Sequence, residues 1–117
     1  IVEDAVKFAE REVRRGNRYD AVILDPPSYG HGPKGEAWKI ERHLDDLLAS
    51  CAALTGGRTA FILLTCHSPG IRPGRLKTSL AESFAGVAPD AVRVRTLYLR
   101  TAGGRRLPSG LAAYWPK

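Results

Sequence analysis

Two short polar runs follow apolar segments that are typical of buried strands. Residues 25–29 read Asp-Pro-Pro-Ser-Tyr after the apolar run 21–24, and residues 66–68 read Cys-His-Ser after the largely apolar run 59–65. A carboxylate beside rigid backbone carbonyls can accept hydrogen bonds from a ligand, while the prolines remove donors and fix the exit of the loop. A thiol becomes a nucleophile when it is ionised and within reach of a substrate. These two runs are the first candidates for a site.

Each candidate also has a plainer interpretation. Residues 25–27 can be a strand that ends in a proline turn, and Cys66 can be a small buried residue at a strand end. Cys51 falls on the apolar face of an expected helix, so we expect it in the core. The two cysteines and three histidines fit no disulfide framework and no zinc spacing. We therefore expect reduced thiols and no metal.

The elements that must position these residues alternate along the chain. Apolar spacing predicts helices over residues 5–15, 37–54 and 73–84, and strands over 19–25, 59–65, 93–99 and 111–115. Residues 28–35 hold three glycines and a proline, and they predict a mobile loop. Strands separated by long helices form parallel crossovers, so the fold class is α/β with one antiparallel strand at the end. In such sheets ligands bind beyond the carboxyl ends of the strands, where both polar runs fall.

Composition and charge limit the function classes. A chain of 117 residues with 44% hydrophobic residues forms at most one domain, and its longest run without a charge or a turn former, residues 59–68, is about half of a membrane span. We expect a cytoplasmic protein without a membrane partner. The net charge of +6 is uneven: residues 1–58 sum to −1 and residues 59–117 sum to +7. An anionic partner such as nucleic acid would be attracted to the second half, although a merely solvated basic surface is the alternative.

The beginning of the chain predicts a piece of something longer. Residues 1–4 read Ile-Val-Glu-Asp, with no initiator Met and with the pattern of a strand end that enters a helix. A strand end at a terminus needs neighbouring strands with which to pair. We therefore expect residues 1–117 to be part of one domain, with no second domain.

The run at 25–29 resembles the fourth motif of class I S-adenosylmethionine-dependent methyltransferases. Its Asp-Pro-Pro-Ser-Tyr form is most similar to the group that methylates bases of large-subunit ribosomal RNA. The resemblance covers nearly the whole chain, from the Val-Glu-Asp-Ala turn at 2–5 to the strand that ends in Thr-Cys-His-Ser at 65–68. It implies a Rossmann-like sheet, of which this chain would supply the last four of seven strands, mostly parallel with an antiparallel terminal strand.

The resemblance also implies a cofactor, S-adenosyl-L-methionine. Asp4 matches the family's acid that accepts from the adenine amino group, with Ala5 beside it, and Asp25 and Pro26 would lie near the methyl-bearing sulfonium. For Asp4 a helix N-cap is the alternative, and a carboxylate can fill both roles. The family's Gly-rich cofactor loop is absent from the sequence and would precede Ile1.

Roles in catalysis follow from the same resemblance. Asp25 and the carbonyls of Pro26 and Pro27 would orient the acceptor, and Tyr29 would stack on it. Cys66 matches the thiolate of RNA cytosine-C5 methyltransferases, and it would be a nucleophile only if the target is cytosine C5. His67 departs from the Ser expected after that Cys.

Four residues are candidates for contact with RNA, because cations interleaved with aromatic rings suit phosphate contact and base stacking. They are Lys34, Trp38, Arg72 and Arg75. For Trp38 the alternative is packing against the sheet, and for each cation it is simple solvation.

The function predicted for the whole protein is methyl transfer to a base, with ribosomal RNA as the partner. Two other classes stay open. One is a methyltransferase of small molecules or proteins, in which the basic half is incidental. The other is a non-catalytic fragment that folds but binds no cofactor, because the Gly-rich loop is missing.

Overall fold

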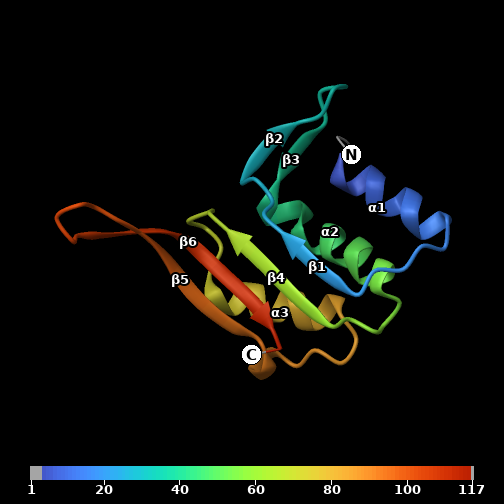
Figure 1. Ribbon diagram of the computed structural model, residues 1–117. Coiled ribbons are helices and arrows are strands. Elements are labelled where there is room, and N and C mark those ends of the chain that lie inside the picture. Colours follow the sequence, from blue (N-terminus) through green and yellow to red (C-terminus); the bar gives the residue numbers. More distant parts are fainter. Residues whose placement is uncertain (1–3, 117) are drawn as a thin grey trace.

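The computed structural model describes residues 4–116, and Figure 1 shows how their helices and strands are arranged. The elements in chain order are α1 (Ala5–Arg14), β1 (Ala21–Leu24), β2 (Tyr29–His31), β3 (Ala37–Lys39), α2 (Ile40–Thr55), β4 (Phe61–Cys66), α3 (Pro73–Ser83), the short 3-10 helix η1 (Pro89–Ala91), β5 (Arg93–Arg100) and β6 (Arg106–Trp115).

Four of the strands form one mixed sheet in the order β1-β4-β6-β5. β1 and β4 are parallel, whereas β6 is antiparallel to both of its neighbours, β4 and β5. The predicted α/β class and the antiparallel terminal strand are therefore confirmed. The last strand of the chain inserts between β4 and β5, so β6 lies next to the strand that ends at Cys66.

The core lies on one face of this sheet, which α2 and α3 cover (Figure 1). Alternate residues of each strand point into it, as the two-residue period of a strand requires. Val22, Ile62, Leu64 and Ala113 from the strands pack there against apolar side chains of α2 and α3. Ile40, Leu44 and Leu48 of α2 and Leu76 and Leu80 of α3 are all fully buried.

The first helix is fixed at both of its ends. Asp4 caps it, with one carboxylate oxygen accepting from the backbone N–H of Lys7 at 3.0 Å. Near its other end, the buried Glu12 carboxylate accepts from Asn17 Nδ2 at 2.6 Å and from the Tyr19 hydroxyl at 2.7 Å. These hydrogen bonds hold the pKa of Glu12 below its ordinary value, and the bond from Asn17 has the largest effect. They connect α1 to the start of β1.

Most boundaries differ from the sequence prediction by one or two residues, and the ribbon after β1, the start of α2 and the start of β6 differ by more. Part of the segment predicted as a mobile loop pairs as the antiparallel ribbon β2–β3, with Tyr29 opposite Lys39 and His31 opposite Ala37. The turn of this ribbon closes through Gly32, whose N–H donates to the Glu36 carbonyl at 2.7 Å. Ala37 therefore lies in a strand, and α2 begins at Ile40. β6 begins at Arg106 instead of residue 111, so the terminal hairpin is longer than predicted.

Candidate functional site

A cavity of about 360 Å³ lies beyond the carboxyl end of β1, between that strand, the start of α1 and the β2–β3 ribbon. All four residues predicted to bind the cofactor line it, although they come from two segments of the chain. They are Asp4, Ala5, Asp25 and Pro26. Pro27 and Trp38 also line the cavity, and Val6, Leu24 and Leu47 make much of its wall apolar. Its volume is within the range of about 300–1,000 Å³ that is common for sites of small molecules.

Asp4 lines this cavity, and within residues 4–116 only one of its carboxylate oxygens has a hydrogen-bond partner. Its Oδ1 serves as the helix cap, and a carboxylate can accept further bonds at its second oxygen. The capping role and the proposed contact with a ligand are therefore compatible in this geometry. The cap also brings the N-terminal end of α1 to the cavity.

Asp25 is the most connected of the predicted site residues. Its Oδ1 accepts a hydrogen bond from the Thr65 hydroxyl of β4 and lies 3.4 Å from Nε2 of His67. Among residues 4–116 we find no partner for its Oδ2. The side chain is largely exposed, so this ion pair contributes little to stability, and its effect is to orient the carboxylate. One oxygen of Asp25 is thus held in place on a side chain that is largely exposed.

His67 is the functional candidate that sequence reasoning did not select. Its Nδ1 lies 2.6 Å from the carbonyl oxygen of Ser109 on β6, and because a carbonyl only accepts, Nδ1 must carry a hydrogen. Nε2 can then donate to Asp25 only when the ring is protonated. The signal in the sequence was its position next to Cys66 at a strand end. Its partner on β6 could not be foreseen, because the insertion of that strand was unknown.

A second groove, of about 440 Å³, lies on the other side of His67. It runs between the end of β4, the start of α3 and the β5–β6 hairpin. Residues that line it include His67, Ser68, Arg72, Thr96 and Pro108. A hydrogen bond of 2.5 Å between the hydroxyls of Ser68 and Ser28 joins the two polar runs of the sequence. The ends of β1 and β4 thus form one continuous edge, as the sequence predicts.

Cys66 is among the residues that line the second groove, but its side chain packs in the core. It is 1% exposed and belongs to the apolar cluster between the sheet and the helices. Successive residues of a strand point to opposite faces, so His67 faces the site and the Cys66 thiol faces the core. This burial favours the plainer interpretation, a small residue that ends a strand. Cys51 is buried as predicted, and burial raises the pKa of its thiol to about 11.

The two aromatic candidates have different surroundings. Tyr29 is 54% exposed, and its hydroxyl is hydrogen-bonded to Nε2 of His31 on the same strand. The two rings meet at 87° with centroids 4.9 Å apart, and the exposed part of the Tyr29 ring can stack on a base. Trp38 packs against the core and donates from Nε1 to the Pro27 carbonyl at 2.7 Å. Trp38 therefore anchors the proline turn to the ribbon, which corresponds to the packing alternative.

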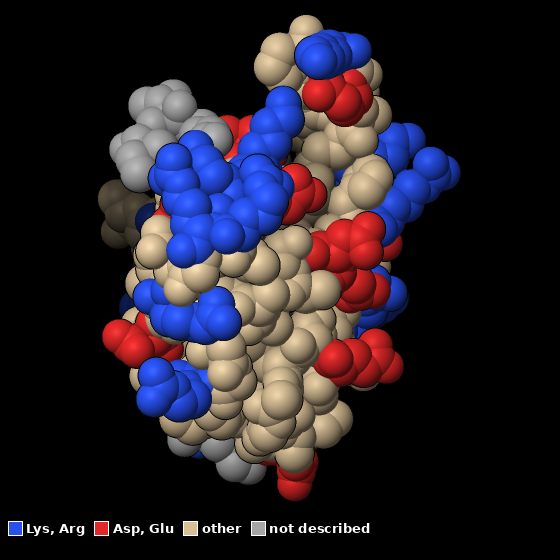
Figure 2. Space-filling view, turned by 90° about the vertical axis from the view of Figure 1, so that its right-hand side faces the viewer, with Lys and Arg blue, Asp and Glu red and all other residues tan. Residues whose placement is uncertain are grey.

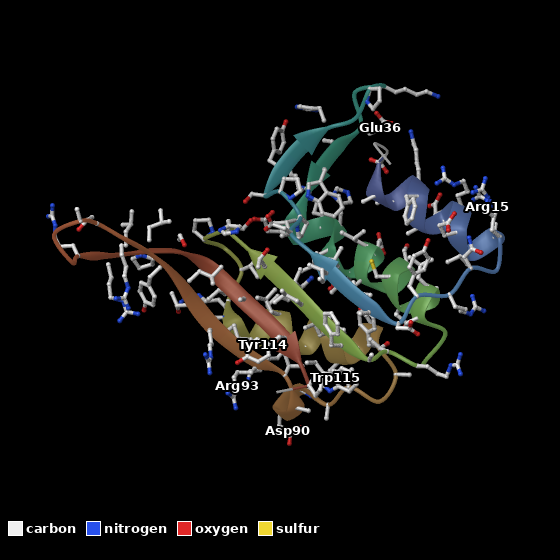
Figure 3. All side chains as sticks on the ribbon, viewed as in Figure 1. Arg15, Glu36, Asp90, Arg93, Tyr114 and Trp115 are labelled. Atoms are coloured by element: carbon white, nitrogen blue, oxygen red, sulfur yellow. The ribbon has the colours of Figure 1, made fainter. Side chains whose placement is uncertain are left out.

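The three predicted RNA-contacting cations do not form one group. Lys34 is exposed in the turn of the β2–β3 ribbon, near Glu36, which Figure 3 labels at the tip. Arg72 is exposed and lines the second groove. Arg75 donates to Asp45 Oδ2 at 2.6 Å and to the Ser79 hydroxyl at 2.9 Å, so α2 offsets its charge. Arg72 is the one of the three that lies at the candidate site.

Metal and membrane features are also absent from the described part of the chain. Residues 4–116 hold no group of three His, Cys, Asp or Glu side chains that could ligate a metal ion. Within the same residues, no helix has the length and apolar character needed to cross a bilayer.

Comparison with known proteins identifies solved structures that share this fold. No known protein family model matches the chain, and neither does any curated protein. Among solved structures, the similar ones include S-adenosylmethionine-dependent methyltransferases, and the described chain has their α/β fold with a mixed sheet.

Two of these structures are informative. The S-adenosylmethionine-dependent methyltransferase from Agrobacterium tumefaciens matches all of this chain with a TM-score of 0.83 and 34% identity. SMU.776, crystallised in complex with S-adenosylhomocysteine, matches 97% of the chain with a TM-score of 0.67 and 16% identity, which shows the fold alone. This chain spans 39% of the length of the first protein and 30% of the second.

Proposed function

We propose that this chain is part of an S-adenosylmethionine-dependent methyltransferase that transfers a methyl group to a base of ribosomal RNA. The observation that carries the proposal is the single cavity that gathers Asp4, Ala5, Asp25 and Pro26 beyond the end of β1. The 34% identity to a methyltransferase of the same fold supports the reaction class. The Asp-Pro-Pro-Ser-Tyr run and the basic second half support the RNA target.

The residues of the cavity fit the cofactor. The apolar wall suits a purine ring, and the free oxygen of Asp4 suits the exocyclic amino group of adenine. Asp25 and Pro26 would lie at the end of the cofactor that reacts. When bound, S-adenosylmethionine supplies an electrophilic methyl group on a sulfonium.

The work of this chain's own residues is to position the acceptor. Asp25 is oriented by Thr65, and by His67 when the imidazole is protonated, so its second oxygen can accept a hydrogen bond from an amino group of the base. Tyr29 can stack on the ring of that base. Holding the reacting atoms at near contact accounts for much of the rate enhancement in such a transfer. This scheme needs no thiol, in agreement with the burial of Cys66.

The test is methyl transfer by the full-length protein that contains this chain. We expect it to move labelled methyl from S-adenosylmethionine to ribosomal RNA. The Asp25→Asn variant should lose activity by about 100-fold, because the carboxylate that orients the acceptor is gone. Asp20→Asn, which changes an exposed carboxylate at the opposite end of β1, is the matched control and should remain active.

Three results would contradict the proposal. No transfer to any RNA would exclude the RNA target, and transfer to a small molecule or a protein would support that alternative. Equal loss of activity in both variants would remove the special role of Asp25. Calorimetry of the 117-residue chain with S-adenosylmethionine should show weak or no binding, because the sequence holds no Gly-rich cofactor loop. Submicromolar binding would contradict this view of an incomplete site.

A further inference from the structure

The β5–β6 hairpin projects well beyond the rest of the sheet (Figure 1). Its outer part, residues 98–108, is exposed at every position, and we call this segment the arm. The strands of the arm stay paired, with Tyr98 opposite Pro108 and Arg100 opposite Arg106. The arm is therefore a paired ribbon whose side chains are exposed to solvent. Packing in the core does not account for the residue types found there.

The charge of this region has a single sign. Residues 91–116 hold five arginines and no Asp or Glu, which differs from every other basic part of the chain. The arginines are Arg93, Arg95, Arg100, Arg105 and Arg106. Within residues 4–116, none of these five guanidinium groups forms an ion pair. Such a ribbon attracts an anionic partner, and the planar donor geometry of arginine matches phosphate.

The arm also carries a platform for stacking. The guanidinium carbon of Arg106 lies 3.9 Å from the ring centroid of Tyr98, so the two planar groups are stacked. Tyr98 is still 43% exposed. Aromatic rings and arginine planes are the groups on which proteins stack unpaired bases of single-stranded RNA.

The platform lies beside the second groove. Thr96 and Pro108 line this groove, and Tyr98 is paired with Pro108. His67, which contacts Asp25, lines the same groove. A strand that lies on the arm can therefore continue along the groove to the carboxyl edge of β1 and β4. Arg72 lines the same path.

The other basic surface is a weaker candidate. Figure 2 shows Lys and Arg gathered on the face that includes α1, with Asp and Glu close to them. In that cluster Arg15 lies 3.4 Å from Glu12, so an acidic residue offsets part of the charge. The base of the hairpin differs from α1, because its arginines lie near an aromatic ring. The guanidinium carbons of Arg93 and Arg95 lie 6.0 and 5.9 Å from the ring centroid of Tyr114, and Figure 3 labels Arg93 and Tyr114.

We propose that the arm binds a single-stranded segment of the RNA substrate next to the target base. Tyr98 and Arg106 would stack on its bases, and Arg100 and Arg105 would contact its phosphates. This inference rests on the proposed function, because it assigns an additional contact surface to the same substrate.

The experiment measures binding of a fluorescent 12-nucleotide RNA without secondary structure to the 117-residue chain. We expect Tyr98→Ala to weaken binding by about tenfold, as the loss of one stacking platform does. The double variant Arg100→Gln with Arg105→Gln removes two phosphate contacts and should reduce the magnitude of the slope of log K against log salt by about 1.4. Arg14→Gln with Arg15→Gln on α1 removes charge of the same kind and should leave binding close to wild type. Circular dichroism should show that all variants stay folded, since every changed side chain is exposed.

Several outcomes would overturn the inference. If the arm variants bind as wild type does, or if the α1 variant loses as much affinity, the arm is not the contact surface. Equal binding of a double-stranded RNA of the same length would contradict the stacking role, because paired bases do not offer their faces to Tyr98 and Arg106. Activity of the full-length protein distinguishes failure of the proposed methyl transfer from failure of the proposed RNA binding by the arm. If the Tyr98→Ala variant transfers methyl groups with an unchanged KM for RNA, only the RNA-binding role of the arm is refuted. RNA binding that depends on the arm, without methyl transfer, refutes only the proposed reaction.

Discussion

At the scale of single residues, the site depends on which way each side chain points at the end of β4. Cys66 and His67 are neighbours in the chain, yet the thiol lies in the core and the imidazole lies 3.4 Å from Asp25. Both side chains are plausible participants in chemistry when judged by residue type alone. The pleat of the strand decides between them, because it turns successive residues to opposite faces.

The burial of both thiols gives a prediction about Cys66. In the full-length protein, Cys66→Ser should retain methyl transfer within about threefold of wild type, because addition of a buried thiol to a base cannot occur. In the folded 117-residue chain, a thiol reagent such as dithionitrobenzoate should react with neither cysteine until denaturant is added. Loss of transfer in the stable Cys66→Ser variant, together with rapid labelling of Cys66, would restore the nucleophile hypothesis.

At the scale of elements, the position of β6 completes the site. This strand pairs with β4 as far as Cys66 opposite Leu111, which brings Ser109 and Gly110 beside the polar end of β4. The carbonyl of Ser109 then holds the ring of His67. Gly110 permits this approach, because a Cβ at that position would lie 2.6 Å from Nδ1 of His67 and 2.7 Å from the Cys66 carbonyl.

The predicted effect of Gly110→Ala follows from that geometry. Its φ of +152° and the two short contacts should cost about 1–3 kcal/mol in the free energy of unfolding, and they should displace His67 from Asp25. Gly74→Ala is the control, because a Cβ there meets nothing within 4 Å and the residue lies in α3. Urea denaturation should show the control to be at least as stable as wild type. Equal stability of the two variants would mean that β6 does not constrain His67.

At the scale of the whole molecule, the sheet is covered on one face only within residues 4–116. The helices pack against the face that holds Ile62 and Leu64 (Figure 1). On the opposite face Ile23 is 68% exposed, and Phe61, one position before Ile62 on β4, is also exposed. Within these residues, the burial of apolar side chains therefore stabilises the sheet almost entirely through the face that α2 and α3 cover.

A matched pair of isoleucines tests this asymmetry. Ile62→Ala should destabilise the chain by about 2–5 kcal/mol, because it opens a cavity in the core. Ile23→Ala, on the neighbouring strand and the opposite face, should cost less than about 1 kcal/mol, because water already reaches that side chain. The free energies of unfolding from urea titrations give both values. Comparable losses would show that the second face is also covered in solution.

Much of the fold was predictable from the sequence because it depends on local patterns. The spacing of apolar residues indicated α1, α2 and α3, and branched apolar runs indicated β1 and β4. The β2–β3 ribbon was not predicted, because glycines and a proline are typical of loops. Its strands form through cross-strand pairing, for example that of Gly30 with Trp38, which a local pattern does not contain.

By itself, the sequence determined the chemistry that is available: Asp25 and the prolines after one strand, Cys66 to Ser68 after another, and a basic second half. It also determined that both polar runs meet at one edge, because the carboxyl ends of parallel strands coincide. Only the tertiary structure decided that β6 inserts next to β4, that His67 rather than Cys66 faces Asp25, and that five arginines share one hairpin. Strand order and side-chain direction arise from pairings between residues far apart in the chain, and no local pattern encodes these.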